Sequence, residues 1–132
     1  MKKGVVKNNR FSEILLFSVF IVIIGLVIVA AIMRHNFQSK NDMKKIEELT
    51  KIQNALENYF DNENAYPASL SLLAPKYIAA IPPKINDDDW IYSSMYKNQS
   101  YILKINMQVL TEQEPNIIKE EDKPYYVLYA KK

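Results

Sequence analysis

The fold of this chain is decided by the stretch Ile14-Leu15-Leu16-Phe17-Ser18-Val19-Phe20-Ile21-Val22-Ile23-Ile24-Gly25-Leu26-Val27-Ile28-Val29-Ala30-Ala31-Ile32-Met33. These twenty residues include no charge, and only Ser18 and Gly25 are not strongly apolar. As a helix the stretch would be about 30 Å long, which matches the hydrocarbon core of a bilayer. A helix that is apolar on every side needs lipid or a large protein interior. The sequence therefore predicts one membrane-spanning helix over residues 14–33.

A cleaved secretory signal is the alternative interpretation of this stretch. The chain starts with basic residues, and Val29-Ala30-Ala31 could serve as a cleavage site. The apolar core of a signal is about 7 to 15 residues long, however, and here the apolar residues continue past that length. We therefore favour a retained membrane anchor.

The segments on either side of the anchor differ in charge. Residues 1–13 form a basic leader with four basic residues and one acidic residue, a net charge of +3. Residues 34–132 carry thirteen basic and fourteen acidic residues, a net charge of −1, which argues against a nucleic-acid partner. Long domains cross a membrane largely regardless of charge. We therefore expect a single-pass protein of the cytoplasmic membrane, with its N-terminus on the cytoplasmic side and its C-terminal domain outside the cell membrane.

Several kinds of chemistry are disfavoured by composition. The chain has no cysteine, so disulfides, thiol nucleophiles and thiolate metal sites are excluded. It has only two glycines, Gly4 and Gly25, which leaves no glycine-rich phosphate loop. The sequence therefore predicts a protein that is not an enzyme and holds no cofactor.

Three consecutive carboxylates, Asp87, Asp88 and Asp89, are the one candidate metal site. Calcium takes six to eight oxygen ligands, and Glu112, Glu114 or Asp122 could add to these three. Adjacent carboxylates in a solvated loop are the commoner arrangement. We expect no metal here and keep calcium as the alternative.

Beyond the anchor, residues 34–62 predict an amphipathic continuation of the same helix. Apolar residues recur there at three- and four-residue spacing, which is typical of one buried helix face. They are Met43, Ile46, Leu49, Ile52, Leu56, Tyr59 and Phe60. The run Asp61-Asn62-Glu63-Asn64 then ends the helix, because asparagine tolerates the left-handed conformation.

Residues 63–132 predict a small domain that contains a sheet. Ser69–Leu73 is expected to form one helical turn, and strands are expected at Trp90–Tyr96, Ser100–Gln108 and Tyr125–Ala130. The acidic segment Thr111–Lys123 is expected to be an exposed loop. The predicted fold class is α+β, with a long N-terminal helix packed on a three-stranded antiparallel sheet.

This layout resembles the type IV pilin and type II secretion pseudopilin superfamily. The motifs that carry the resemblance are Phe11-Ser12-Glu13-Ile14-Leu15-Leu16 at the start of the apolar helix, the run Asn54–Leu70 with Tyr66-Pro67, and then Pro75-Lys76-Tyr77-Ile78 and Ile81-Pro82. The later motifs resemble those of major pseudopilins. The resemblance implies a subunit whose apolar helix polymerises in a filament core while its sheet domain forms the outer surface.

The resemblance also implies a role for Glu13 in assembly. Members of the family carry a glutamate near the start of the apolar helix that pairs with the N-terminal amine of a neighbouring subunit. A carboxylate at the edge of a lipid-facing helix is costly unless paired, and it is favourable at a helix N-terminus. A charge that only rests at the lipid headgroups is the alternative for Glu13.

Leader processing is the second family property, and it would fall on Asn8, Asn9, Arg10 and Phe11. In the family, a prepilin peptidase cuts after a glycine and leaves a methylated aromatic residue, with the glutamate fifth in the mature chain. Here Asn8-Asn9 stands at that junction, and Phe11 lies two residues before Glu13. The family implies other pilin-like subunits as partners. A monomeric anchored binding domain with a tyrosine-rich surface is the alternative function.

Overall fold

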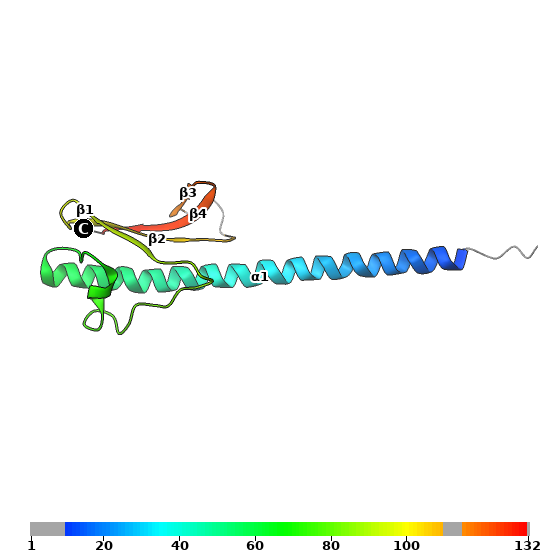
Figure 1. Ribbon diagram of the computed structural model, residues 1–132, viewed down its shortest axis with the longest axis horizontal. Helices are drawn as coiled ribbons and strands as arrows, with labels where there is room; N and C mark the ends of the chain where they lie inside the picture. Colours follow the sequence, from blue (N-terminus) through cyan, green and yellow to red (C-terminus); the bar gives the residue numbers. More distant parts are fainter. Residues whose placement is uncertain (1–9, 110–114, 132) are drawn as a thin grey trace, which may run out of the picture. The chain divides into compact units, whose positions relative to one another are not determined.

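The computed structural model describes residues 10–109 and 115–131. The chain divides into two compact units, residues 1–36 and residues 37–132. The first unit contains the N-terminal part of helix α1, and the second contains the rest of α1 together with the sheet (Figure 1).

Helix α1 spans Arg10–Glu63, a run of 54 residues without glycine or proline except Gly25. The predicted apolar stretch lies wholly inside it, and within the described residues α1 is the one helix long and apolar enough to cross a membrane. The helix stops where Asn64 takes a left-handed φ of 54° and its N–H bonds to the Phe60 carbonyl at 2.8 Å. Asparagine thus supplies the helix end that the sequence predicted.

The sheet is antiparallel and has four strands, in the order β1-β2-β4-β3. Their bounds are Ile91–Met95 for β1, Ser100–Asn106 for β2, Ile117–Glu120 for β3 and Lys123–Tyr129 for β4. The predicted α+β class is confirmed. The predicted number of strands was wrong, because the sequence indicated three.

The missed strand, β3, lies in the segment Thr111–Lys123 that was predicted to be a loop. Residues 111–114 of that segment lie outside the described residues. Glu120 pairs with Lys123, so Glu121 and Asp122 form a two-residue hairpin turn with φ values of 50° and 62°. Asn-Gly and Asp-Gly are the common pairs in such turns. Glu-Asp gives no comparable signal, and the acidic run therefore resembled a loop.

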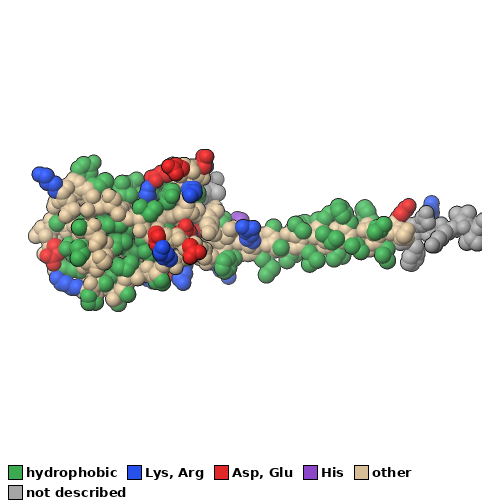
Figure 2. Space-filling view, viewed as in Figure 1, with side chains coloured by type: hydrophobic (Ala, Val, Ile, Leu, Met, Phe, Trp, Pro, Cys, Tyr) green, Lys and Arg blue, Asp and Glu red, His purple; other side chains and the backbone are tan. Residues whose placement is uncertain are grey.

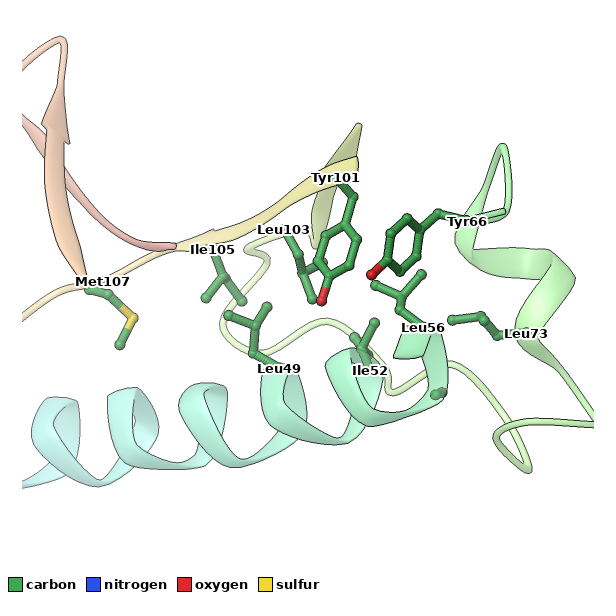
Figure 3. Close-up of a cluster of buried hydrophobic side chains, with 10 residues drawn as sticks. Leu49, Ile52, Leu56, Tyr66, Leu73, Tyr101, Leu103, Ile105 and Met107 are labelled. Carbon is green, nitrogen blue, oxygen red and sulfur yellow. The ribbon is translucent and has the colours of Figure 1, made fainter. Parts of the chain in front are cut away.

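The core lies between the sheet and one face of α1 (Figure 3). Alternate residues of β2 and its continuation, which are Tyr101, Leu103, Ile105 and Met107, are all buried, because side chains alternate between the two faces of a strand. They pack with Leu49, Ile52 and Leu56 of the helix. Burying side chains of this size stabilises the fold by about 1.5–3 kcal/mol each.

The segment between α1 and β1 packs on the same core from another side. In Figure 1 it runs below α1, while the sheet lies above the helix. It contains the 3-10 helix η1, Leu70–Leu73, which is the predicted helical turn, and Leu73 is fully buried. The Trp90 indole N–H donates to the Pro82 carbonyl at 2.7 Å and thereby fixes the entry into β1.

One expected core residue is on the outside. Met43 is 66% exposed, whereas Asp42 and Lys45 are fully buried. The buried positions Asp42, Lys45, Leu49, Ile52 and Leu56 follow one another at intervals of three or four residues, so the face that meets the sheet starts with two charged residues.

Candidate assembly surface

The first candidate surface is the apolar stretch of α1. Every residue from Ile14 to Met33 is exposed in the chain, and its large hydrophobic side chains are 43–69% exposed. Figure 2 shows hydrophobic side chains along this stretch of the helix without an interrupting charge. Such a surface is stable only against lipid or against other apolar helices. The chain itself supplies no cover for it among the described residues.

Gly25 lies in the middle of this surface. A Cβ atom built on it would meet nothing within 4 Å, so no contact inside the described chain requires a glycine. Glycine in a helix costs about 0.5–1 kcal/mol relative to alanine. In membrane helices, small residues let two backbones approach closely.

Glu13 lies in the first turn of α1, where its carboxylate faces the positive end of the helix dipole. Its side chain is exposed, and no ion pair joins it to another residue of the described part of the chain. Arg10, the first residue of the helix, is also exposed. Phe11 is the second residue of the helix, and Asn8 and Asn9 lie outside the described residues.

A second feature is a buried ion cluster around Lys45. The Lys45 ammonium donates to Asp88 Oδ2 at 2.6 Å and to the Asn106 carbonyl at 2.8 Å, and it lies 3.6 Å from Asp42 Oδ1. Asp42 in turn accepts the backbone N–H groups of Gln108 and Val109 at 2.9 and 2.7 Å. A buried charge is tolerated when its partners are this complete. The cluster ties α1 to the end of β2 and to the loop before β1.

The cluster also bears on the candidate calcium site. Asp88 is engaged by Lys45, and Asp89 pairs with Lys84 at 2.7 Å. Asp87 is in the same loop with a φ of 62°. Within residues 10–109 and 115–131 no group of three metal-ligating side chains is found. Glu112 and Glu114 lie outside the described residues, and calcium stays the alternative for this loop.

A third feature is a buried carboxylate further along α1. Glu57 accepts the hydroxyl of Tyr66 and the hydroxyl of Tyr101, each at 2.9 Å, and the backbone N–H of Lys131 at 3.3 Å. The two tyrosine rings meet edge to face, with centroids 4.7 Å apart (Figure 3). Burial, and then the bond to Glu57, raises the pKa of Tyr66 and of Tyr101 far above the ordinary value. This arrangement holds the end of the chain against α1.

Sequence reasoning missed these buried polar residues, which are Asp42, Lys45, Gln53 and Glu57. Gln53 donates to the Tyr129 carbonyl at 3.1 Å and ties α1 to β4. A signal was available for Asp42 and Lys45, because they extend the three- and four-residue spacing of Leu49, Ile52 and Leu56 toward the N-terminus. Because Asp42 and Lys45 are charged, the pattern of apolar residues did not include them.

No protein-family model, no curated protein and no solved structure matches this chain. The resemblance to the pilin superfamily is therefore carried by the sequence motifs alone.

Proposed function

We propose that this protein is a structural subunit of a type IV pilus-like or type II secretion-like filament and that it assembles through its apolar N-terminal helix. The observation that carries the proposal is the exposure of α1 on every side from Ile14 to Met33. A helix of this kind can exchange lipid for neighbouring copies with little change in its surroundings. The proposal assigns the chain no catalysis and no cofactor.

Two further observations support helix-to-helix assembly over simple anchoring. Gly25 has open space around it, which suits the close approach of a second helix. Glu13 carries a charge at the end of the apolar surface and has no ion-pair partner in the described chain. A cation from a neighbouring copy would offset the cost of that charge in a bundle.

The finer features of the proposal follow the family resemblance. The chain would sit in the cytoplasmic membrane with its N-terminus inside and its domain outside, before extraction into a filament. A prepilin peptidase would cut the leader in the region Asn8–Phe11 and leave a methylated N-terminus. Partners would be further copies or related pilin-like subunits.

A monomeric anchored binding domain is less well supported. That alternative needs tyrosines on the surface, and only Tyr96 and Tyr129 of the nine are exposed. The other tyrosines are buried or half-buried in unit 2, where they fill the core and its margins. The tyrosine content is therefore explained by packing.

Cysteine crosslinking in membranes tests the proposal cleanly, because the natural chain has no cysteine. A chain with both Val22→Cys and Val27→Cys would carry thiols about 140° apart around the helix. A filament core gives a ladder of covalent oligomers on oxidation, whereas each single variant stops at a dimer. Ser93→Cys, which is exposed on β1, serves as the control. If the double variant stays monomeric, filament assembly is refuted and the anchored monomer is the better account.

A further inference from the structure

Exposed basic residues lie on the part of α1 with which unit 2 begins. Unit 2 starts at Phe37, and Lys40 and Lys44 follow at intervals of three and four residues, so the three side chains share one side of the helix. Phe37 is 64% exposed, and both lysines are exposed. No ion pair ties either lysine to another residue of the described ranges. We call these three residues the basic stripe.

The basic stripe is turned away from the buried ion cluster of unit 2. Because an α-helix turns about 100° per residue, Lys45 lies about 80° around α1 from Phe37. Lys40 and Lys44 lie about 60° and 20° from Phe37 in the opposite direction. The acidic loop Asp87–Asp89 pairs with α1 at Lys45, at a distance of 2.6 Å. The ion pair of that loop is therefore made on the other side of the helix.

Positive charge is concentrated at the start of unit 2 and just before it. Four basic residues lie between positions 34 and 46, namely Arg34, Lys40, Lys44 and Lys45. Asp42 is the one acidic residue in that range, and it is buried. The next two acidic residues, Glu47 and Glu48, both pair with Lys51 at 2.9 Å. The excess of positive charge is therefore greatest in the residues that follow the apolar stretch most closely.

The membrane anchor keeps the basic stripe close to the bilayer surface. Phe37 and Lys40 come four and seven residues after Met33, the last residue of the apolar stretch. At 1.5 Å per residue they are about 6 Å and about 10 Å further along α1, and Lys44 is about 16 Å further. The headgroup region extends about 5–8 Å beyond the hydrocarbon core. Both ammonium groups are therefore within about one Debye length of the headgroups, the range over which charges attract.

Anionic phospholipids have the chemistry that matches this surface. Their phosphate oxygens accept charge-assisted hydrogen bonds from ammonium groups, and each basic residue next to a membrane span favours such lipids by about fivefold. We propose that Lys40 and Lys44 bind the phosphates of anionic phospholipids in the leaflet on the side of unit 2. The inference rests on the membrane anchor of the proposed function, and it adds the class of lipid that surrounds the chain before assembly.

The test uses the full chain in vesicles of phosphatidylcholine and phosphatidylglycerol, at a low ratio of protein to lipid. Electron spin resonance of each lipid, spin-labelled on its acyl chain, measures how strongly the protein prefers phosphatidylglycerol. Lys40→Gln with Lys44→Gln should reduce that preference about two- to threefold. High salt should reduce the preference of the unaltered chain, since it screens the attraction.

Lys97→Gln with Lys131→Gln is the matched control, because it removes the same charge from two other exposed lysines. The Gln99 side chain donates to the Asn64 carbonyl at 3.0 Å, so the turn that contains Lys97 lies beside the C-terminal end of α1. That end is about 30 Å along the helix from Lys44. The control should leave the preference for phosphatidylglycerol unchanged.

Three results would overturn the inference and leave the proposed function in place. They are an unchanged preference in the Lys40/Lys44 variant, an equal loss in the control, and a loss of the Val22/Val27 ladder on removing the two lysines while the lipid preference persists. The last result would place the lysines against a neighbouring copy. Failure of the unaltered chain to insert into vesicles would instead refute the anchor, and with it the proposed function.

Discussion

The two parts of α1 differ in how their apolar surface is covered: residues 14–33 are exposed, whereas one face of residues 42–57 is buried against the rest of unit 2. From Ile14 to Met33 the helix is apolar on every side and meets no other part of the described chain. From Asp42 to Glu57 only one face is apolar, and charged residues are buried at both ends of it. Both parts belong to one continuous helix. The difference lies in where each finds its partners.

Charged side chains of α1 are buried only where polar groups from other segments surround them. Lys45 and Glu57 are buried because carbonyls, carboxylates and hydroxyls from distant segments surround them. In the apolar stretch no such groups exist, and a charge there would cost about 2.5–3.5 kcal/mol at the bilayer centre. One helix therefore carries a segment specified by its own composition and a segment specified by the sheet.

The largest expected effect is on the domain part. Lys45→Met should lower the free energy of unfolding by about 3–5 kcal/mol, because Asp42 and Asp88 would lose the cation between them. Chemical denaturation of the full chain in detergent measures this. Lys44→Met is the matched control one residue away, and its exposed side chain should change stability by no more than about 0.5 kcal/mol. Equal effects of the two variants would show that the Lys45 cluster does not hold the sheet on α1.

The next effect is on the apolar part of α1. Glu13→Gln should leave insertion unchanged, since an uncharged side chain is easier to place near lipid. The crosslinked ladder of the Val22/Val27 variant should nevertheless fall about a hundredfold, because the partner cation would stay unpaired in a bundle. Quantitative blotting of the oxidised membranes gives the ratio. A full ladder from Glu13→Gln would reduce Glu13 to a charge at the headgroups.

A smaller effect is expected at the buried Glu57 carboxylate and its two tyrosine partners. Tyr101→Phe removes one donor to the Glu57 carboxylate and should lower the free energy of unfolding by about 1.5–3 kcal/mol. Tyr92→Phe makes a fair comparison, because the Tyr92 hydroxyl donates to a neutral carbonyl, that of Pro67, at 2.6 Å. Its cost should be nearer 1 kcal/mol. A larger loss for Tyr92→Phe would contradict the special role of the Glu57 carboxylate.

The same hydroxyls set a limit at alkaline pH. Burial raises the pKa of Tyr92 to about 12, from an unfolded value near 10. A group with a raised folded pKa contributes stability that is complete below pH 10 and is lost as the pH rises toward 12. Between these two pH values, this group should therefore lower the free energy of unfolding by about 1.4 kcal/mol per pH unit. Tyr92→Phe should remove that part of the slope, and denaturation at pH 9 and pH 11 would show whether it does.

The smallest effect concerns Gly25. Gly25→Ala meets no atom within 4 Å, so the helix itself should keep or slightly gain helicity by circular dichroism. The Val22/Val27 ladder should fall about two- to fivefold if a neighbouring helix approaches this position closely. An unchanged ladder would place the helix contact on another face.

The sequence by itself determined the apolar helix, its end at Asn64, the α+β class and the inward face of β2. Each of these depends on residues close together in the chain: twenty apolar positions, an asparagine at a helix end, or alternation over Tyr101–Met107. The candidate residue Glu13 was visible in the same way, since the role proposed for it depends on its place beside the apolar run.

Tertiary structure alone decided the rest. Lys45 is buried because Asp88 and Asn106, which lie 43 and 61 residues away, close around it. Strand β3 exists because β4 offers it an edge, although its Glu-Asp turn gives little local signal. A groove of about 320 Å³ forms where the run Ile78–Ile85 passes beside Lys44 and Lys51 of α1. Polar burial and strand pairing depend on contacts between distant segments, and local composition carries almost no information about which segments will meet.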